Sequence, residues 1–198
     1  MSEQQQLDAH YWDNRYETQT TGWDLGIIST PLREYFEQLT NKDQAILIPG
    51  CGNAYEAEYL LKNGFTNITV VDFSAHAVAA IKERLKEYDD RQLHVIHANF
   101  FSLQQQFDLI IEQTFFCALD PALRKDYAIK MSELLNKDGK LAGIMFNREF
   151  EGGPPFGGTS EEYQALFAPL FEIKTMSPCN NSVAPREGTE VFIILKKK

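Results

Sequence analysis

Between residues 45 and 146, short apolar segments alternate with longer segments whose apolar residues recur at helical spacing. Short apolar runs predict buried strands, and apolar residues every three or four positions predict helices with one apolar face. The predicted strands are 45–49, 68–72, 93–97, 107–112 and 140–146, and the predicted helices are 54–63, 74–88 and 121–135. Such alternation indicates a parallel sheet with helices on both faces.

Both ends of the chain extend this pattern. Thr30-Pro31 predicts a helix over 31–39, because proline suits the first helical position. Thr159-Ser160-Glu161-Glu162 fits a capping box for a helix over 160–168, and residues 136–139 predict a turn before the fifth strand. Two last strands, 170–176 and 190–195, are joined by a loop alone and are expected to pair antiparallel. The expected fold is therefore α/β, with a seven-stranded, mostly parallel sheet and a C-terminal antiparallel hairpin.

A glycine turn follows the first predicted strand, and it is the clearest candidate for chemistry. Gly50 and Gly52 flank one residue between that strand and the next helix, and Asp72 ends the second strand 22 residues after Gly50. Glycines let a backbone approach a ligand closely, and a carboxylate at this spacing can bind ribose hydroxyls. Asp72 could instead cap the helix 74–88, although Ser74 is better placed for that role.

The same turn discriminates between cofactors. Tyr55 occupies the place of the third glycine of the dinucleotide fingerprint, which normally packs beside a pyrophosphate. A tyrosine there argues against NAD or FAD and is compatible with S-adenosylmethionine. Phe100 or Phe101, after the third strand, could sandwich adenine or belong to the core, and Gln113 could face the same crevice or merely begin a loop.

Composition limits the other function classes. Apolar residues make up 43% of the 198 residues, which suits a single domain over 1–198, and no apolar run is long enough to span a membrane. The net charge of −9, with only Lys196-Lys197-Lys198 as a basic cluster, disfavours nucleic acid. Three scattered cysteines suit a reducing cytoplasm, and neither they nor the four histidines have metal-ligand spacing. We expect a cytoplasmic monomer that acts on a small molecule and holds no metal.

Four segments carry a family resemblance: Ile-Pro-Gly-Cys-Gly (48–52), Asn-Phe-Phe (99–101), Phe-Phe-Cys-Ala-Leu-Asp-Pro (115–121) with Arg124, and Gly-Gly-Pro-Pro-Phe (152–156). Together they resemble the thiopurine S-methyltransferase superfamily, and most of all its branch of thiol, thiocyanate and halide methyltransferases. The resemblance implies a Rossmann-like class I methyltransferase fold, with S-adenosylmethionine as methyl donor. It also implies donor contacts at Gly50, Asp72, Asn99, Phe100 and Gln113.

The resemblance further implies that an aromatic N-terminal segment, residues 1–40, folds over the donor. Trp12, Tyr16 and Trp23 match its aromatic positions, and aromatic faces attract a sulfonium cation while excluding water. These rings could also simply anchor the segment to the body. Two positions depart from the family: Asn99 stands where aspartate is usual, and Phe146 where many halide-type members carry tyrosine.

Two features are candidates for the binding site of the methyl acceptor. Arg124 matches the arginine of the family's Asp-Pro-x-x-Arg segment, and its cation could attract an anionic acceptor such as a thiolate; the alternative is a surface ion pair with Asp120 or Asp126. The loop 152–158, stiffened by prolines between glycines, is expected to wall the acceptor pocket with Phe156 facing the substrate. Cys51 and Cys117 are expected to be packing residues.

Three functions follow from these residues. The first is methyl transfer to a small soft nucleophile, meaning a thiol, a thiopurine-like compound, thiocyanate or a halide. The second is methyl transfer to an oxygen or nitrogen nucleophile of another metabolite, and the third is a donor-binding protein without turnover.

Overall fold

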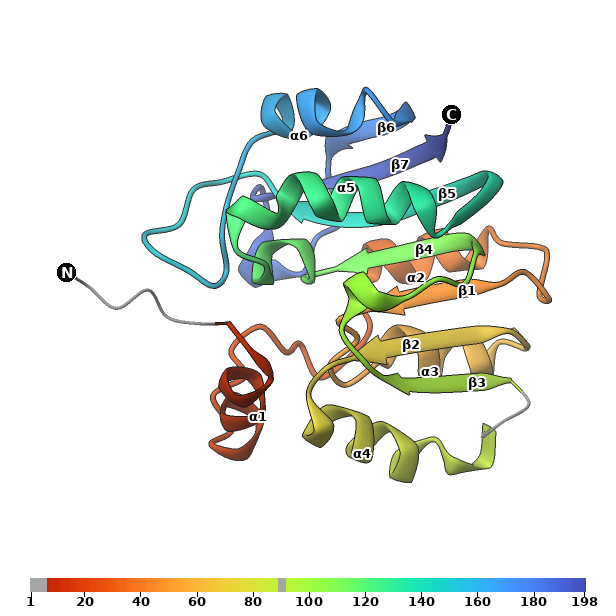
Figure 1. The fold of residues 1–198 in the computed structure, drawn as a ribbon. Coiled ribbons are helices and arrows are strands. Elements are labelled where there is room, and N and C mark those ends of the chain that lie inside the picture. The colour runs from red at the N-terminus through yellow and green to blue at the C-terminus, as the bar shows by residue number, and fades with distance from the viewer. Residues whose placement is uncertain (1–6, 89–91) are drawn as a thin grey trace.

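A computed structural model describes residues 7–88 and 92–198, and it is built on one seven-stranded sheet (Figure 1). Its strands are β1 (Ile46–Pro49), β2 (Ile68–Asp72), β3 (Leu93–His97), β4 (Phe107–Gln113), β5 (Leu135–Phe146), β6 (Phe171–Pro178) and β7 (Glu190–Lys197). They lie in the order β3-β2-β1-β4-β5-β7-β6. Pairing is parallel from β3 through β5, and β7 is antiparallel to both β5 and β6. The predicted sheet and its C-terminal hairpin are confirmed.

Helices cover both faces of the sheet, as expected. One apolar cluster joins the sheet to α2 (Thr30–Glu37), α3 (Tyr55–Lys62) and α4 (Ala75–Arg84). A second cluster joins the opposite face to α5 (Arg124–Glu133) and α6 (Ser160–Phe167). Within β1, Ile46 and Ile48 pack into the first cluster and Leu47 into the second, because successive side chains of a strand point to opposite faces.

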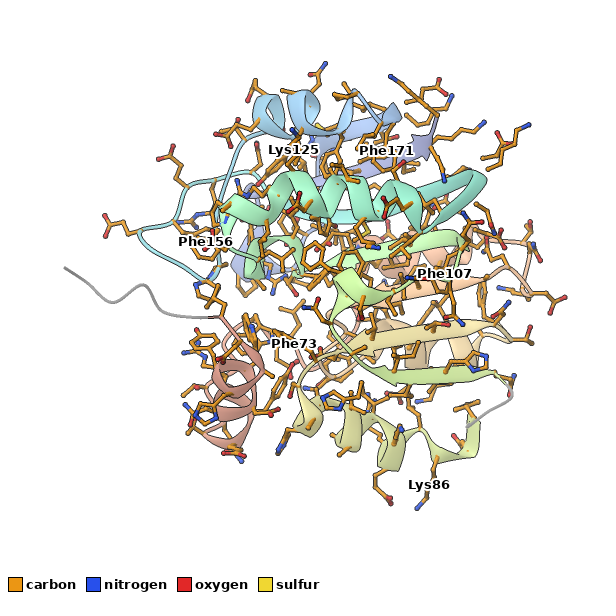
Figure 2. All side chains as sticks on the ribbon, viewed as in Figure 1. Phe73, Lys86, Phe107, Lys125, Phe156 and Phe171 are labelled. Carbon is orange, nitrogen blue, oxygen red and sulfur yellow. The ribbon has the colours of Figure 1, made fainter. Side chains whose placement is uncertain are left out.

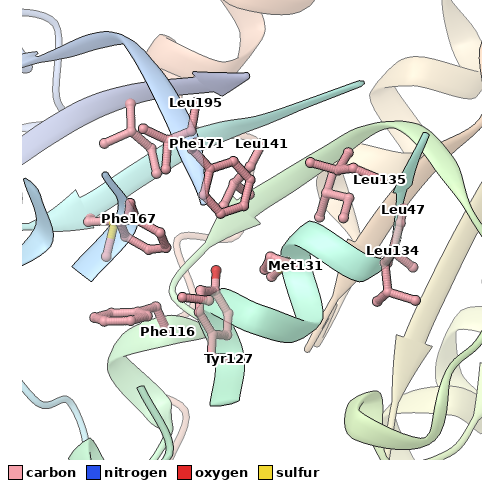
Figure 3. Close-up of a cluster of buried hydrophobic side chains, with 14 of the residues drawn as sticks. Leu47, Phe116, Tyr127, Met131, Leu134, Leu135, Leu141, Phe167, Phe171 and Leu195 are labelled. Carbon is pink, nitrogen blue, oxygen red and sulfur yellow. The ribbon is translucent and has the colours of Figure 1, made fainter. Parts of the chain in front are cut away.

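The second cluster is rich in aromatic rings and includes two tyrosine hydroxyls, one of which, on Tyr127, is drawn in Figure 3. Tyr127 is fully buried there and packs against Phe116 and Phe167, at ring-centroid distances of 5.0 and 6.4 Å. Its hydroxyl donates a 2.5 Å hydrogen bond to the carboxylate of Glu112, near the end of β4. A buried polar group needs such a partner, and here the partner lies one residue before the end of β4.

Three local predictions need correction at their boundaries. The helix expected over 121–135 is a short 3₁₀ turn over 121–123 followed by α5, because Asp120 caps the turn through the N–H of Ala122. The turn expected over 136–139 lies inside β5, where Asp138 adopts a left-handed conformation and the pairing with β4 shifts register. Likewise, α4 ends at Arg84, and a 3₁₀ turn covers 86–88.

The N-terminal segment contains a helix that the sequence pattern did not predict. This helix, α1 (Ala9–Glu17), begins at Asp8, whose carboxylate accepts the N–H of Tyr11. It lies beyond the carboxyl ends of the parallel strands and packs against α4 (Figure 1). Residues 1–6 of the expected 1–40 segment lie outside the described residues. No helix of the described chain is long and apolar enough to cross a membrane.

Candidate active site

A cleft of about 1050 Å³ opens at the carboxyl ends of the parallel strands, between the sheet and the N-terminal segment. This edge is where ligands bind in open α/β sheets. Of the residues predicted for the site, nine line it: Trp12, Tyr16, Trp23, Gly50, Asp72, Asn99, Phe100, Gln113 and Phe146. The other two, Arg124 and Phe156, are not among its lining residues.

The glycine turn forms the floor of the cleft. Gly50 and Gly52 both have positive φ, at 56° and 49°, which L-residues rarely adopt. A side chain at Gly50 would also overlap the ring of Phe115. Glycine is therefore required here both by backbone conformation and by space, and the resulting floor is bare backbone that a ligand can approach.

Asp72 is fixed beside this turn by backbone donors. One carboxylate oxygen accepts the N–H of Gly52 at 3.0 Å, and the other accepts the N–H of Ser74 at 2.9 Å. Burial raises the pKa of Asp72, and these N–H groups oppose the rise. Ser74, not Asp72, is the N-cap of α4, since its hydroxyl accepts the N–H of Ala77.

Asn99, Phe100 and Phe101 form the wall after β3. The side-chain oxygen of Asn99 accepts the N–H of Phe101, so its amide NH₂ is the part that can donate to a ligand. Phe100 is 5% exposed and packs edge to face on Phe101 and Phe115. It therefore belongs to the core and also lines the cleft, and its contact with adenine stays a prediction. Phe73, after β2, lines the cleft on the side of α1 (Figure 2).

Glu112 and Gln113 organise the loop after β4. The buried carboxylate of Glu112 accepts the N–H groups of Phe115 and Phe116 at 2.8 and 2.9 Å. Burial raises the pKa of Glu112 to about 7. Gln113 accepts a hydrogen bond from the hydroxyl of Ser29 at 3.1 Å, which ties this loop to the start of α2.

The N-terminal segment closes the cleft with aromatic side chains. Trp23 packs edge to face on both Trp12 and Tyr16, at ring-centroid distances of 5.4 and 6.0 Å. Asp13 attaches α1 to the start of α4, because its carboxylate accepts the hydroxyl of Ser74 at 2.5 Å and the N–H of His76 at 3.2 Å. The segment is thus anchored to the body and also lines the cleft.

Arg186 is a functional candidate that the sequence reasoning missed. It is 8% exposed and lines the cleft, with its guanidinium 5.4 Å from the ring centroid of Phe146. It donates to the carbonyl of Trp23 at 2.7 Å and pairs with Glu190 at 3.5 Å. Pairing of the predicted strands would have indicated it. Glu190 lies opposite Phe146 in the β5–β7 pair, and Arg186, four residues before Glu190, is therefore close to the end of β5.

Arg124 and Phe156 lie elsewhere. Arg124 donates to the carbonyl of Gly157 at 2.6 Å, and its guanidinium lies over the ring of Phe116. It therefore fixes the loop 152–158 without lining the cleft. No ion pair with Asp120 or Asp126 occurs within the described chain. Phe156 packs where a side chain at Gly153 would be, and its N–H donates to the carbonyl of Cys117 at 2.6 Å (Figure 2). The loop still contributes Pro154 and Pro155 to the cleft.

The cysteines near the cleft are suited to packing. Burial raises the pKa of the Cys117 thiol to about 12 and that of the Cys51 thiol well above its usual range. Both thiols are therefore protonated at neutral pH, which removes them as nucleophiles. Within the described ranges, no group of three or more His, Cys, Asp and Glu side chains could hold a metal.

These features define the class of the protein: a sheet of this order, with a glycine turn and an aromatic cover, is the class I methyltransferase fold. A 1,6-didemethyltoxoflavin N1-methyltransferase of Burkholderia thailandensis shares it with a TM-score of 0.74 and 16% identity, over 96% of this chain and 87% of that one. A TehB-like SAM-dependent methyltransferase of Corynebacterium glutamicum has a TM-score of 0.68 and 15% identity, over 96% and 98%.

The sequence comparisons identify the family. The model of the thiopurine S-methyltransferase family matches residues 7–194, and the chain belongs to this family. It is 30% identical to a probable thiol methyltransferase 2 of Arabidopsis thaliana over 184 residues, which are 90% of this chain and 81% of that protein. It is 24% identical to a thiopurine S-methyltransferase of Acinetobacter baylyi, over 86% and 88%. The chain is a methyltransferase, and its donor is S-adenosylmethionine.

The cleft fits this donor. A cationic side chain of the cover, Arg15, lines the cleft and has a buried Nε without a hydrogen-bond partner among the described residues. The floor at Gly50 admits no side chain. A ligand that carries both a nucleoside and a charged amino-acid group matches such a surface, because unpaired buried polar atoms are costly.

Proposed function

We propose that this methyltransferase transfers its methyl group to the sulfur of a small organic thiol. The acceptor would bind at the end of the cleft formed by Phe146, Phe150 and Arg186. The observation that carries this proposal is the buried guanidinium of Arg186 beside an apolar ring. A thiol reacts as its thiolate, which a nearby guanidinium favours, and Arg186 keeps N–H donors beyond those it shares with Glu190 and the carbonyl of Trp23. The names of the thiol and thiopurine methyltransferase relatives support the same acceptor class.

The donor, when bound, supplies a methyl group already activated by the positive sulfonium, so the side chains mainly position the reactants and exclude water. Asp72 would receive the ribose hydroxyls, and Asn99 and Phe100 would hold the adenine. Trp12, Tyr16 and Trp23 would cover the sulfonium, because aromatic faces attract cations. Gln113 would lie beside the methyl group that is transferred. Arg186 would then act by attraction alone, since a guanidinium stays protonated at neutral pH.

The shape of the acceptor end favours an organic thiol over an inorganic anion. Phe146 and Phe150 meet edge to face at 5.0 Å, and Arg148 lies over the ring of Phe150 at 4.7 Å. Two rings offer an apolar surface that an iodide or thiocyanate ion would leave uncovered. Phe146 also offers no hydroxyl to a halide. We therefore propose that halides are poorer acceptors than thiols for this protein.

Steady-state turnover with a panel of acceptors tests this proposal. The panel contains benzenethiol, hydrogen sulfide, thiocyanate, iodide, phenol and aniline, and the variants are Arg186→Gln and Arg186→Lys. We expect benzenethiol to be methylated fastest by the wild type. We expect Arg186→Gln to lower kcat/KM for it about 10- to 100-fold, with partial recovery in Arg186→Lys, because a charged contact contributes about 1.5–3 kcal/mol.

The other outcomes are informative. Faster methylation of phenol or aniline would replace the thiol with an oxygen or nitrogen acceptor. Donor binding without turnover of any acceptor would indicate a binding protein without activity. Because Arg186 also donates to the carbonyl of Trp23 in the cover, donor affinity of each variant is measured alongside. A loss of kcat/KM explained entirely by donor affinity would refute the proposed role of Arg186.

The proposal also includes a monomeric enzyme of a reducing, cytoplasmic compartment that does not bind nucleic acid. The free thiols of Cys51, Cys117 and Cys179 support the compartment, and the net charge of −9 opposes binding to a phosphate backbone. We expect sedimentation of the purified protein at the mass of one chain, 22.6 kDa. A larger species at micromolar concentration would contradict the monomer.

A further inference from the structure

One buried side chain that lines the cleft carries a carboxylate whose one hydrogen-bond partner in the described chain is its own backbone N–H. Glu56, in the first turn of α3, is 7% exposed and lines the cleft beside the glycine turn. Within residues 7–88 and 92–198, no other residue hydrogen-bonds to its carboxylate or forms an ion pair with it. The other buried carboxylates differ: Asp72 and Glu112 accept backbone N–H groups, and Glu190 pairs with Arg186. An unpaired buried carboxylate is costly, so its retention points to a ligand.

The charges around Glu56 limit what that ligand can be. Burial raises the pKa of Glu56 to about 7, while the attraction of Arg186 lowers it and the repulsion of Asp24 raises it. The thiol of Cys51, in the glycine turn, is the remaining titratable neighbour. Asp24 is already engaged by the side chains of Asn53 and Tyr55. Beside the glycine turn, a ligand cation would therefore meet the carboxylate of Glu56, which no other described residue engages.

The order of the strands assigns a part of the donor to this position. The cleft residues follow the sheet in sequence: Asn99 and Phe100 come after β3, Asp72 ends β2, Glu56 comes after β1, and Gln113 ends β4 (Figure 1). If the adenosine lies over β3 and β2, the rest of the donor extends over β1 toward the end of the cleft where the acceptor would bind. The part that reaches β1 is the amino-acid group, which carries the donor's ammonium.

We propose that the carboxylate of Glu56 binds the α-ammonium of the donor's amino-acid group. Glu56 is then a specificity residue for the donor, because it distinguishes a complete donor from nucleosides that share its adenosine. The inference rests on donor binding in the cleft and is independent of which acceptor is methylated. It involves no bond making, only the exchange of water for a charge-assisted hydrogen bond.

Calorimetric titration with two ligands tests this role without relying on turnover. S-adenosylhomocysteine contains the amino-acid group, whereas 5′-deoxy-5′-methylthioadenosine has the same adenosine and sulfur without it. We expect Glu56→Gln to weaken S-adenosylhomocysteine binding about 10- to 100-fold and methylthioadenosine binding less than about twofold. Glu58→Gln is the matched control on the same helix, since Glu58 pairs with Lys62 and Arg84 instead of facing the cleft, and both ligands should bind it as they bind the wild type.

A second measurement needs no variant. Glu56 would have to be ionised to bind an ammonium, and burial raises its pKa to about 7, so near pH 7 the wild type should release a fraction of a proton on binding S-adenosylhomocysteine, and none on binding methylthioadenosine. Titrations in two buffers of different ionisation enthalpy measure this release. Equal weakening of both ligands by Glu56→Gln, unchanged affinity for both, or equal proton release by both would overturn the proposal. Failure of the wild type to bind either ligand would instead refute the donor site itself.

Discussion

Replacing Tyr127 with phenylalanine removes one hydroxyl from the core beneath the active site. The ring of Tyr127 is fully buried, with Phe116 at 5.0 Å and Phe100 at 6.0 Å, and Phe can keep these contacts. The hydroxyl donates to Glu112 at 2.5 Å, and Glu112 in turn fixes the loop that carries Phe115 and Cys117 into the cleft. Tyr127→Phe therefore isolates a single hydrogen bond to a carboxylate whose charge depends on pH.

The cost of this variant should rise with pH. Burial raises the pKa of Glu112 from 4.5 to about 7, so the carboxyl is ionised at pH 8 and protonated at pH 5.5. A hydrogen bond to a charged group contributes about 1.5–3 kcal/mol, against about 0.5–1.5 kcal/mol for a neutral pair. We expect Tyr127→Phe to cost about 1.5–3 kcal/mol at pH 8, which lowers Tm by about 3–12 °C, and about half as much at pH 5.5.

Urea unfolding of both proteins at pH 5.5 and pH 8, extrapolated linearly to water, measures these costs. Tyr163→Phe is the matched control, because the buried Tyr163 donates to the neutral carbonyl of Phe146 at 2.6 Å in the same cluster. Its cost should be about 0.5–1.5 kcal/mol at either pH. An equal or larger cost of Tyr127→Phe at pH 5.5 would refute the reasoning about Glu112.

Three further variants test the parts of the site separately. Arg124→Ala, which frees the carbonyl of Gly157, should raise KM for the acceptor several-fold and leave S-adenosylhomocysteine affinity unchanged in calorimetry; a weaker ligand affinity would contradict its position behind the loop. Asp13→Ala should speed S-adenosylhomocysteine dissociation in stopped-flow tryptophan fluorescence several-fold, because α1 loses its hydrogen bonds to α4; an unchanged rate would show that the aromatic contacts suffice. Gly50→Ala should abolish detectable donor binding, whereas Gly64→Ala, which has positive φ but open space, should cost only about 1–2 kcal/mol of stability; donor binding by Gly50→Ala would refute the tight floor.

The central strands β1 and β2 were predictable because they are continuous buried runs. All four residues of β1 are buried, and helices on both faces leave no polar position to interrupt the run. The hairpin of β6 and β7 was predictable from the loop between them, since a parallel crossover needs more chain. Residues 136–139, expected as a turn, lie inside β5, where Asp138 is left-handed and the register with β4 shifts between Leu135 and Lys140.

The missed features depend on contacts that are distant in the sequence. No residue of α1 is fully buried, so its apolar spacing is too weak to indicate a helix; its capping by Asp8 and its contacts with α4 hold it in place. Arg186 enters the cleft only because β7 lies beside β5. Arg124 was assigned from a motif, and a motif fixes the position of a residue along the chain without fixing the direction of its side chain.

The central claim is that the cleft catalyses methyl transfer from S-adenosylmethionine to a thiol sulfur. The most direct measurement uses donor with a trideuterated methyl group and benzenethiol, with products analysed by mass spectrometry. We predict a thioether that carries the intact trideuteromethyl group on sulfur, and one S-adenosylhomocysteine for each thioether formed. Bound donor with no labelled thioether, from benzenethiol or any other thiol, would contradict the account.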